Sequence, residues 1–169
     1  MKNIVLIGFM GVGKGSVARA MVQQTSMMAL DTDDVIESME NRSVKEIFAK
    51  EGEEYFRALE RKTARWLKKK VEGTIISTGG GFFKVPAMKK VGTVVLLNAP
   101  FETIYERILA HPDADKKLKK RPLFQDIDKA GNLYKERVHQ YLAVADIVID
   151  VSNKDVNSIA KEILKKVKK

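Results

Sequence analysis

The sequence predicts an α/β fold in which a parallel sheet is covered by helices on both faces. Short apolar runs, typical of buried parallel strands, alternate with helical patterns along the whole chain. Strands and helices in alternation connect by right-handed crossovers, which gives a three-layer sandwich. The first apolar run also leads directly into a glycine-rich loop and a helix. The runs cover residues 3–8, 27–30, 74–77, 93–97 and 147–151.

Helical patterns fill the segments between these runs. Ser43 and Glu46 form a capping box that begins a helix reaching about Lys50. A longer pattern, with apolar residues three and four positions apart, covers residues 53–71 and ends before Gly73. The other helical patterns cover residues 15–22, 100–109, 133–144 and 156–167.

Two segments interrupt this alternation. Residues from 33 to about 60 form an insertion with two short helices, long enough to build a second wall opposite the glycine-rich loop. Residues 111–126 are polar, rich in lysine and interrupted by Pro112 and Pro122. We expect this second segment to be a mobile lid, of the kind that closes over phosphates and excludes water.

The composition indicates one globular domain over residues 1–169, with 44% hydrophobic and 31% charged residues. The absence of cysteine excludes disulfides and thiol chemistry, which fits a cytoplasmic protein. No apolar run approaches the roughly 20 residues of a transmembrane helix. The first run is broken by Gly8 and Lys14 too early for a signal peptide. We therefore expect a cytoplasmic monomer without a membrane partner.

The formal net charge of +9 invites comparison with nucleic-acid-binding proteins. Much of the excess lies in residues 68–70 and 165–169, at the ends of expected helices, where lysine favours the helix dipole and stays solvated. No aromatic residues alternate with these lysines to stack on bases. We therefore expect no nucleic-acid partner, and the remaining positive charge suits small anionic substrates.

The loop from Gly8 to Lys14 matches the pattern G-x-x-x-x-G-K. In this loop backbone N–H groups surround phosphates, and the lysine reaches the terminal ones. Its glycines permit positive φ angles, and the helix that follows directs its positive end at the phosphates. The sequence thus predicts a nucleoside triphosphate site formed by Gly11, Val12, Gly13, Lys14, Gly15 and Ser16.

One residue departs from this pattern. The lysine is normally followed by a serine or threonine whose hydroxyl binds Mg²⁺, but here Gly15 follows Lys14. A helix turns by about 100° per residue, so Ser16 cannot take over that position. Lys-Gly-Ser resembles the Lys-Gly-Thr of adenylate kinases, where the metal is held largely through water. Gly15 therefore indicates a change in how the metal is held or, alternatively, a loss of activity.

Further motifs follow along the chain. They are Asp31-Thr32-Asp33 after the second apolar run, Phe56-Arg57-Ala58-Leu59-Glu60 on the long helix, Thr78-Gly79-Gly80-Gly81 after the third run, Arg121-Pro122-Leu123 in the lid, and Arg137 before Tyr141. With the glycine-rich loop, they resemble the shikimate kinase family over nearly the whole chain. The resemblance implies a P-loop NTPase fold with a five-stranded parallel sheet. It also implies transfer of the γ-phosphate of ATP to the 3-hydroxyl of shikimate, in chorismate and aromatic amino acid biosynthesis.

The resemblance assigns the carboxylate of shikimate to Arg57 and Arg137, and its accepting hydroxyl to Asp33. Guanidinium groups suit a carboxylate, and a carboxylate beside the hydroxyl can orient it and take its proton. Two other interpretations stay open: the arginines as exposed helix residues in salt bridges, and Asp33 as the N-cap of the next helix. The resemblance also places substrate contacts at Gly79, Gly80 and Gly81.

On the nucleotide side, the resemblance implies that Lys14 bridges the β and γ phosphates. It implies that Arg121 stabilises charge on the transferring group when the lid closes. Arg107 matches a position beside adenine. Asp31 resembles the family's metal-site aspartate, which acts on Mg²⁺ mainly through bound water.

The residues also leave other functions open. Another small-molecule kinase of this fold would act on gluconate or on a nucleoside monophosphate. The Lys-Gly-Ser sequence slightly favours the nucleoside monophosphate. A nucleotide-binding switch or degenerate kinase would bind ATP without turnover, and Gly15 is the argument for it. A basic nucleic-acid binder would bind DNA or RNA with an affinity that falls steeply with salt.

Overall fold

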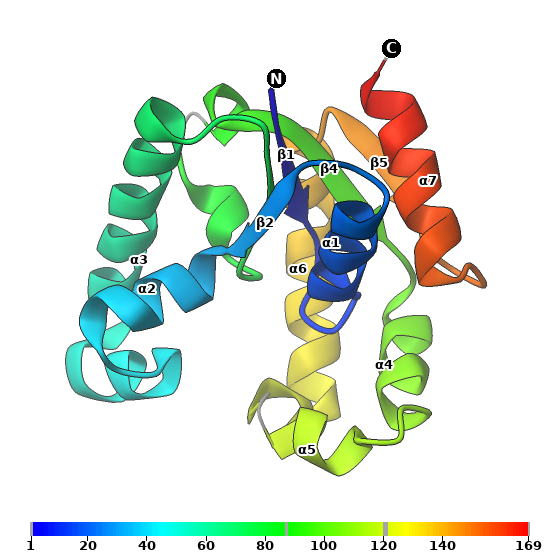
Figure 1. The fold of residues 1–169 in the computed structure, drawn as a ribbon. Coiled ribbons are helices and arrows are strands. Elements are labelled where there is room, and N and C mark those ends of the chain that lie inside the picture. The colour runs from blue at the N-terminus through cyan, green and yellow to red at the C-terminus, as the bar shows by residue number, and fades with distance from the viewer. Residues whose placement is uncertain (1, 87, 120–121, 169) are drawn as a thin grey trace.

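The computed structural model describes residues 2–86, 88–119 and 122–168. Its centre is a five-stranded parallel sheet with the strand order β2-β3-β1-β4-β5 (Figure 1). The predicted parallel sheet is confirmed, and each strand boundary lies within one residue of its expected place. The strands are β1 Asn3–Ile7, β2 Met28–Asp31, β3 Thr74–Ser77, β4 Gly92–Asn98 and β5 Ile147–Asp150.

Strand β1 occupies the middle of the sheet. Its Val5 pairs with Ile76 of β3 on one side and with Val94 of β4 on the other. All five residues of β1 are buried, which explains why its sequence is an apolar run without polar alternation. The loop that follows β1 therefore lies at the centre of the sheet's carboxyl edge, where α/β proteins bind ligands.

Helices cover both faces of the sheet and confirm the three-layer architecture. Helix α1 lies in front of the sheet in Figure 1 and contacts α7, while α6 lies behind the sheet and contacts β4. Within the described residues, no helix is long and apolar enough to cross a bilayer. The α-helices are α1 Lys14–Gln23, α2 Thr32–Glu40, α3 Val44–Lys70, α4 Phe101–Leu109, α5 Ala114–Lys119, α6 Ile127–Val144 and α7 Val156–Val167. The 3₁₀ helices are η1 Phe82–Lys84, η2 Met88–Lys90 and η3 Pro122–Gln125.

The expected insertion consists of α2 and the first part of α3, on the β2 side of the sheet (Figure 1). The predicted capping box at Ser43 is present, and the predicted break between two helices falls at Gly52, where φ is 82°. A small apolar core separate from the main one joins α2 to α3. The insertion is therefore a wall with its own packing. That core consists of Ile36, Ile47, Phe56 and Leu59.

The segment expected to be a lid contains α5 and η3, which the lysine-rich sequence did not predict. Within the described residues, α5 buries no side chain. Helix α6 begins at Ile127, earlier than the predicted residue 133, because the Asp126 side chain accepts a hydrogen bond from the Lys129 N–H and caps it. Arg121 lies outside the described residues.

An aromatic cluster joins this segment to the glycine-rich loop. The ring of Phe9 meets those of Phe101, Phe124 and Tyr134 edge to face, at centroid distances of 6.1, 6.2 and 5.4 Å. Phe124 of η3 is buried in this cluster. The loop, α4, η3 and α6 thus share one packing unit.

A buried polar side chain joins the other end of the sheet. Asn3 donates hydrogen bonds to the carbonyls of Val71 (2.7 Å) and Val91 (2.9 Å) and accepts one from the Thr74 N–H (3.0 Å). Asn3 is 4% exposed, so water cannot reach these backbone groups to replace its hydrogen bonds unless the fold opens. Asn3 therefore connects the starts of three neighbouring strands.

We expect Asn3→Ala to lower the free energy of unfolding by about 2–4 kcal/mol, because it leaves buried backbone groups without partners. Urea unfolding followed by circular dichroism measures this change. Asn132→Ala, at an exposed position on α6, is the control and should change stability by less than about 0.5 kcal/mol. Equal stability of the two variants would contradict the role of Asn3.

Candidate active site

Buried hydroxyls join the carboxyl ends of β1, β2 and β3. Ser77 stands opposite Asp31 in the register, and its hydroxyl donates to Asp31 Oδ2 at 2.7 Å. The hydroxyl of Thr78 donates to the carbonyl of Leu6 at 2.8 Å. Ser77 and Thr78 are 3% and 2% exposed. We call these contacts the strand-end seam; they fix three loops at one edge of the sheet.

The seam continues into α2 and the glycine triplet. The N–H of Gly79 donates to the Thr32 hydroxyl at 3.1 Å, and Thr32 is fully buried. Asp31 Oδ1 accepts the N–H of Asp33 at 2.9 Å, so Asp31 is the N-cap of α2. The alternative in which Asp33 caps this helix is therefore wrong. Asp33 lies in the first turn, with its side chain available to the site.

The loop after β1 has the backbone conformation that its glycines predict. Gly8, Gly11 and Gly13 have φ angles of 144°, 83° and 105°. A Cβ on Gly11 would lie 2.5 Å from the end of the Ile108 side chain, which would have to shift, but the φ angle of 83° alone already favours glycine here. Helix α1 begins at Lys14 and has no acidic residue in its first turn, which leaves its positive end suited to an anion.

The amine of Lys14 lies against its own loop. Its Nζ donates to the carbonyls of Gly8 at 2.7 Å and Phe9 at 3.1 Å, and the residue is 9% exposed. Gly15 has room for a side chain, since a Cβ there would meet Arg19 at an ordinary 3.5 Å. The hydroxyl of Ser16 accepts a hydrogen bond from Arg19 at 3.3 Å.

Asp33 is a partly buried carboxylate with an incomplete set of partners. Among the described residues, its Oδ1 has no hydrogen-bond partner. Burial, reinforced by the charges of Asp31 and Glu60 and opposed by that of Lys14, raises the pKa of Asp33 to about 7. A carboxylate poised near neutral pH is suited to accept a proton.

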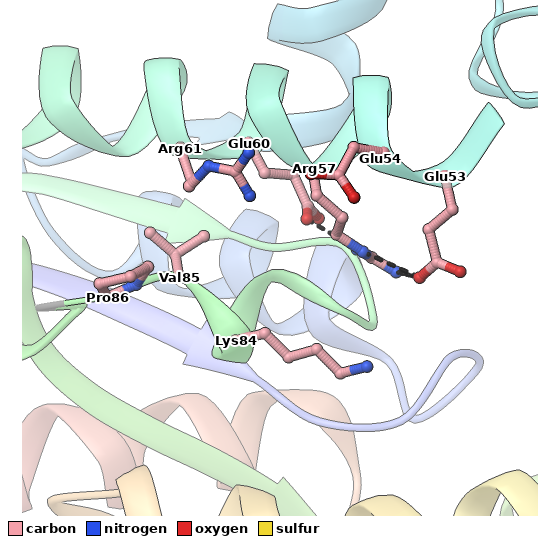
Figure 2. A pocket seen from close by; sticks show the side chains of 8 residues that line it. All are labelled: Glu53, Glu54, Arg57, Glu60, Arg61, Lys84, Val85 and Pro86. Atoms are coloured by element: carbon pink, nitrogen blue, oxygen red, sulfur yellow. Dashed lines mark hydrogen bonds and ion pairs between the residues drawn. The ribbon is translucent and has the colours of Figure 1, made fainter. Parts of the chain in front are cut away.

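Arg57 is held between two carboxylates of its own helix (Figure 2). Its Nη1 lies 2.6 Å from Glu60 Oε2, and its Nε and Nη2 lie 3.1 and 3.0 Å from Glu53 Oε1. The Arg57 side chain is 17% exposed. The interpretation of Arg57 as an exposed salt-bridge residue is therefore half right: the salt bridges are present, but the guanidinium is largely buried.

Arg137 lies on α6 and reaches the glycine triplet. Its Nη1 donates to the carbonyl of Gly80 at 3.3 Å, and the same carbonyl accepts the hydroxyl of Tyr141 at 2.6 Å. The Nε of Arg137 is buried and has no hydrogen-bond partner among the described residues. A buried donor without a partner points to a ligand group that completes it.

The glycine triplet is where the three predicted side chains meet. A Cβ on Gly79 would lie 2.5 Å from Asp33 Oδ1, and one on Gly81 would overlap the guanidinium of Arg57. A Cβ on Gly80 would lie 3.4 Å from Arg137 Nη1. Glycine is thus required at both ends of the triplet for the acid and the cation to approach the backbone so closely.

A cavity of about 430 Å³ opens beside Arg57 (Figure 2). Its walls come from α3 and from the segment that follows the glycine triplet, and they carry charges of both signs. The lining residues are Glu53, Glu54, Arg57, Glu60, Arg61, Lys84, Val85 and Pro86.

Arg107 and Asp31 connect secondary-structure elements. Arg107 donates from Nη2 to the carbonyl of Val151 at 2.7 Å and thereby joins α4 to the end of β5. Asp31 uses both carboxylate oxygens in the strand-end seam. In the described part of the chain, no group of three or more histidine, cysteine or acidic residues could hold a metal ion. Arg121 cannot be placed, since it lies outside the described residues.

The sequence prediction did not assign roles to Glu53, Glu60 or Tyr141. Glu53 and Glu60 lie four residues before and three residues after Arg57, the spacings at which helix side chains meet, so their pairing could have been found. The contact of Tyr141 with Gly80 joins distant parts of the chain and has no such local signal.

The loop after the central strand leads into a helix that begins at Lys14, which is the arrangement of a P-loop kinase. An acid and two arginines lie around the glycine triplet, and they suit a small acid as the second substrate. The family model described as "Shikimate kinase" matches residues 10–168. This chain therefore belongs to the shikimate kinase family, whose members are ATP-dependent kinases.

Individual relatives are similar to this chain over nearly the whole length of both sequences. The shikimate kinase of Sulfurihydrogenibium sp. (strain YO3AOP1) is 39% identical, over 100% of this chain and 99% of the relative. That of Helicobacter hepaticus is 37% identical, over 96% and 99%. The structure of the Acinetobacter baumannii enzyme in complex with shikimate has a TM-score of 0.84 at 30% identity, over 99% and 93%. That of the Aquifex aeolicus enzyme has a TM-score of 0.78 at 35% identity, over 98% and 96%.

The raised pKa of Asp33 predicts the pH dependence of turnover. A general base accepts a proton only when it is ionised, and the pKa of Asp33, the expected base, is about 7. We expect kcat/KM for the acceptor to fall as the pH drops below about 7 and to level off above it. We expect Asp33→Asn to lower kcat on the order of 10²-fold or more. A coupled ADP-release assay over a pH series measures both.

Melting temperatures provide the control. Between about pH 4 and about pH 7, Asp33 is protonated in the native state and ionised in the unfolded state. The stability of the wild type therefore falls as the pH rises through this range. We expect Asp33→Asn to melt above the wild type at about pH 8, and the two to converge near about pH 4. An active Asp33→Asn enzyme with a flat pH profile would contradict the assignment.

Proposed function

We propose that this chain transfers the γ-phosphoryl group of ATP to the 3-hydroxyl of shikimate and produces shikimate 3-phosphate and ADP, in the biosynthesis of chorismate and the aromatic amino acids. One observation carries the proposal: Asp33, Arg57 and Arg137 converge on the glycine triplet, on the side of the sheet edge that Lys14 faces. This convergence supports an anion site and a proton acceptor at the same edge of the sheet as the phosphate loop.

The carboxylate of shikimate binds between Arg57 and Arg137. Each guanidinium has N–H groups left to donate, and the unpaired Nε of Arg137 lacks an acceptor within the described residues. Asp33 then accepts a hydrogen bond from the 3-hydroxyl and takes its proton as the hydroxyl attacks phosphorus. The glycine triplet (Gly79, Gly80 and Gly81) contacts the substrate as well.

ATP binds with its phosphates at the N–H groups of the loop from Gly11 to Ser16. Lys14 leaves the carbonyls of Gly8 and Phe9 and bridges the β and γ phosphates. Phosphoryl transfer requires mainly positioning and charge neutralisation, which Lys14 and the lid residue Arg121 supply. Arg107 contributes beside adenine.

The site fits a magnesium ion that is held mainly through water. Magnesium keeps several waters and takes one or two carboxylates with the substrate phosphates, so an acidic cluster is not needed. Gly15 contributes no hydroxyl, and Ser16 is hydrogen-bonded to Arg19, which leaves the carboxylate of Asp31 and the phosphates to hold the ion. When bound, the ion shields the charge of the triphosphate.

The proposed enzyme is a single domain over residues 1–169 that works as a cytoplasmic monomer. The insertion at about 33–60 supplies its acid-binding wall, and the segment at about 111–126 is its lid. Nucleic acid and membrane take no part in the reaction.

A coupled ADP-release assay with shikimate, gluconate and AMP as acceptors tests the function. We expect turnover with shikimate and, with the other two, only the background of ATP hydrolysis. Repeating the assay across Mg²⁺ concentrations measures how the metal is held beside Gly15. ATP binding without acceptor-stimulated release would instead indicate a nucleotide switch, and turnover of AMP or gluconate would indicate a different kinase.

Arg57→Ala tests the carboxylate site. Loss of a charge-assisted hydrogen-bond pair should raise the KM for shikimate roughly 10- to 100-fold, while the KM for ATP changes little. Arg61→Ala, one helical turn further along the same cavity, is the matched control and should leave both values nearly unchanged. Equal damage to both substrates by Arg57→Ala would contradict the assignment.

A further inference from the structure

The carboxylate of Glu53 already occupies one edge of Arg57. A guanidinium offers two donors along its side edge, Nε–H and Nη2–H, which match a carboxylate. In this structure both donors point to the same oxygen, Oε1 of Glu53, at 3.1 and 3.0 Å. The residue proposed to bind the acid substrate is therefore engaged with an acid of the protein.

The two carboxylates on Arg57 differ in their freedom to leave. The Glu60 side chain is 1% exposed, and its removal from Arg57 would strand a buried charge. The Glu53 side chain is 62% exposed and follows directly on Gly52, where the helix is interrupted. Glu60 is thus a fixed partner, whereas the Glu53 side chain can rotate away from Arg57 into solvent with little loss of free energy.

The surroundings of Glu53 also favour its release as an anion. Hydrogen bonds from Arg57 and, more weakly, the charge of Lys84 hold the pKa of Glu53 below its usual range. Lys84 lies on the facing wall of the same cavity (Figure 2). A Glu53 carboxylate that leaves Arg57 therefore stays ionised beside another cation.

We propose that Glu53 is a displaceable stand-in for the substrate carboxylate: it holds the Nε–Nη2 edge of Arg57 in the free protein and gives this edge up when an acid binds. The inference rests on the proposed function, because it takes the acid to be shikimate. The exchange replaces one carboxylate by another, so Arg57 keeps two carboxylate partners and its pair with the buried Glu60 is undisturbed. A neutral analogue cannot make this exchange, and Glu53 is thereby a specificity-determining residue for anionic substrates.

Titration calorimetry of the full chain with shikimate, without nucleotide, tests the exchange. An exposed ion pair contributes up to about 1 kcal/mol, so Glu53→Gln should tighten shikimate binding about two- to fivefold. The matched control is Glu54→Gln, the next carboxylate along the same cavity, for which no ion pair to Arg57 is found in the described structure. It should change the Kd by less than about 1.5-fold.

A neutral ligand separates the exchange from a general effect of charge or folding. The methyl ester of shikimate should bind Glu53→Gln no more tightly than the wild type, since it brings no anion to Arg57. Unchanged or weaker shikimate binding by Glu53→Gln would overturn the inference alone. Equal tightening by Glu54→Gln, or of the ester, would overturn it in favour of simple charge repulsion. Failure of the wild type to bind shikimate at all would overturn the proposed function itself.

Discussion

The strand-end seam is the constraint on which the rest of the site depends. The hydroxyls of Ser77 and Thr78 donate hydrogen bonds to Asp31 and to the backbone of β1, and the hydroxyl of Thr32 accepts one from the N–H of Gly79. These buried hydrogen bonds tie three neighbouring strands together where they end, so the loops that leave them cannot drift apart. The phosphate loop, the first turn of α2 and the glycine triplet are consequently presented at one edge as a single rigid frame.

Within that frame, the chemistry depends on a balance of buried charge. Burial, followed by the charges of Asp31 and Glu60, raises the pKa of Asp33 to about 7. Arg57 and Arg137 supply the opposite charge, and the absence of a Cβ in the triplet lets all three side chains approach the same backbone. Among the residues that the structure describes, Asp33 Oδ1 and the Nε–H of Arg137 have no hydrogen-bond partner, so both can bind a polar ligand.

Much of this could be predicted from the sequence, because strand runs and motif order are local signals. The sheet and the capping box at Ser43 follow from such signals, whereas the convergence of the motif residues was implied by the resemblance to the shikimate kinase family. The N-cap of α2 was harder to predict, because Asp31 precedes the helix and Asp33 lies in its first turn. The hydrogen bond from the Asp33 N–H to the Asp31 side chain decides between them. The early start of α6 and the helix α5 were missed because a lysine-rich, proline-bounded stretch gives no apolar periodicity. The hydrogen bond of Tyr141 required the tertiary fold.

The aromatic cluster around Phe9 fixes one end of the proposed lid. Phe124 is buried against Phe9 and Phe101, so η3 cannot shift without pulling a ring out of the core, at a cost of about 2–3 kcal/mol. Closure of the proposed lid would therefore have to move α5 while η3 stays in place. Because Phe9 belongs to the loop after β1, that loop and η3 share one packing contact, and a substitution that repacks Phe124 would also alter the loop.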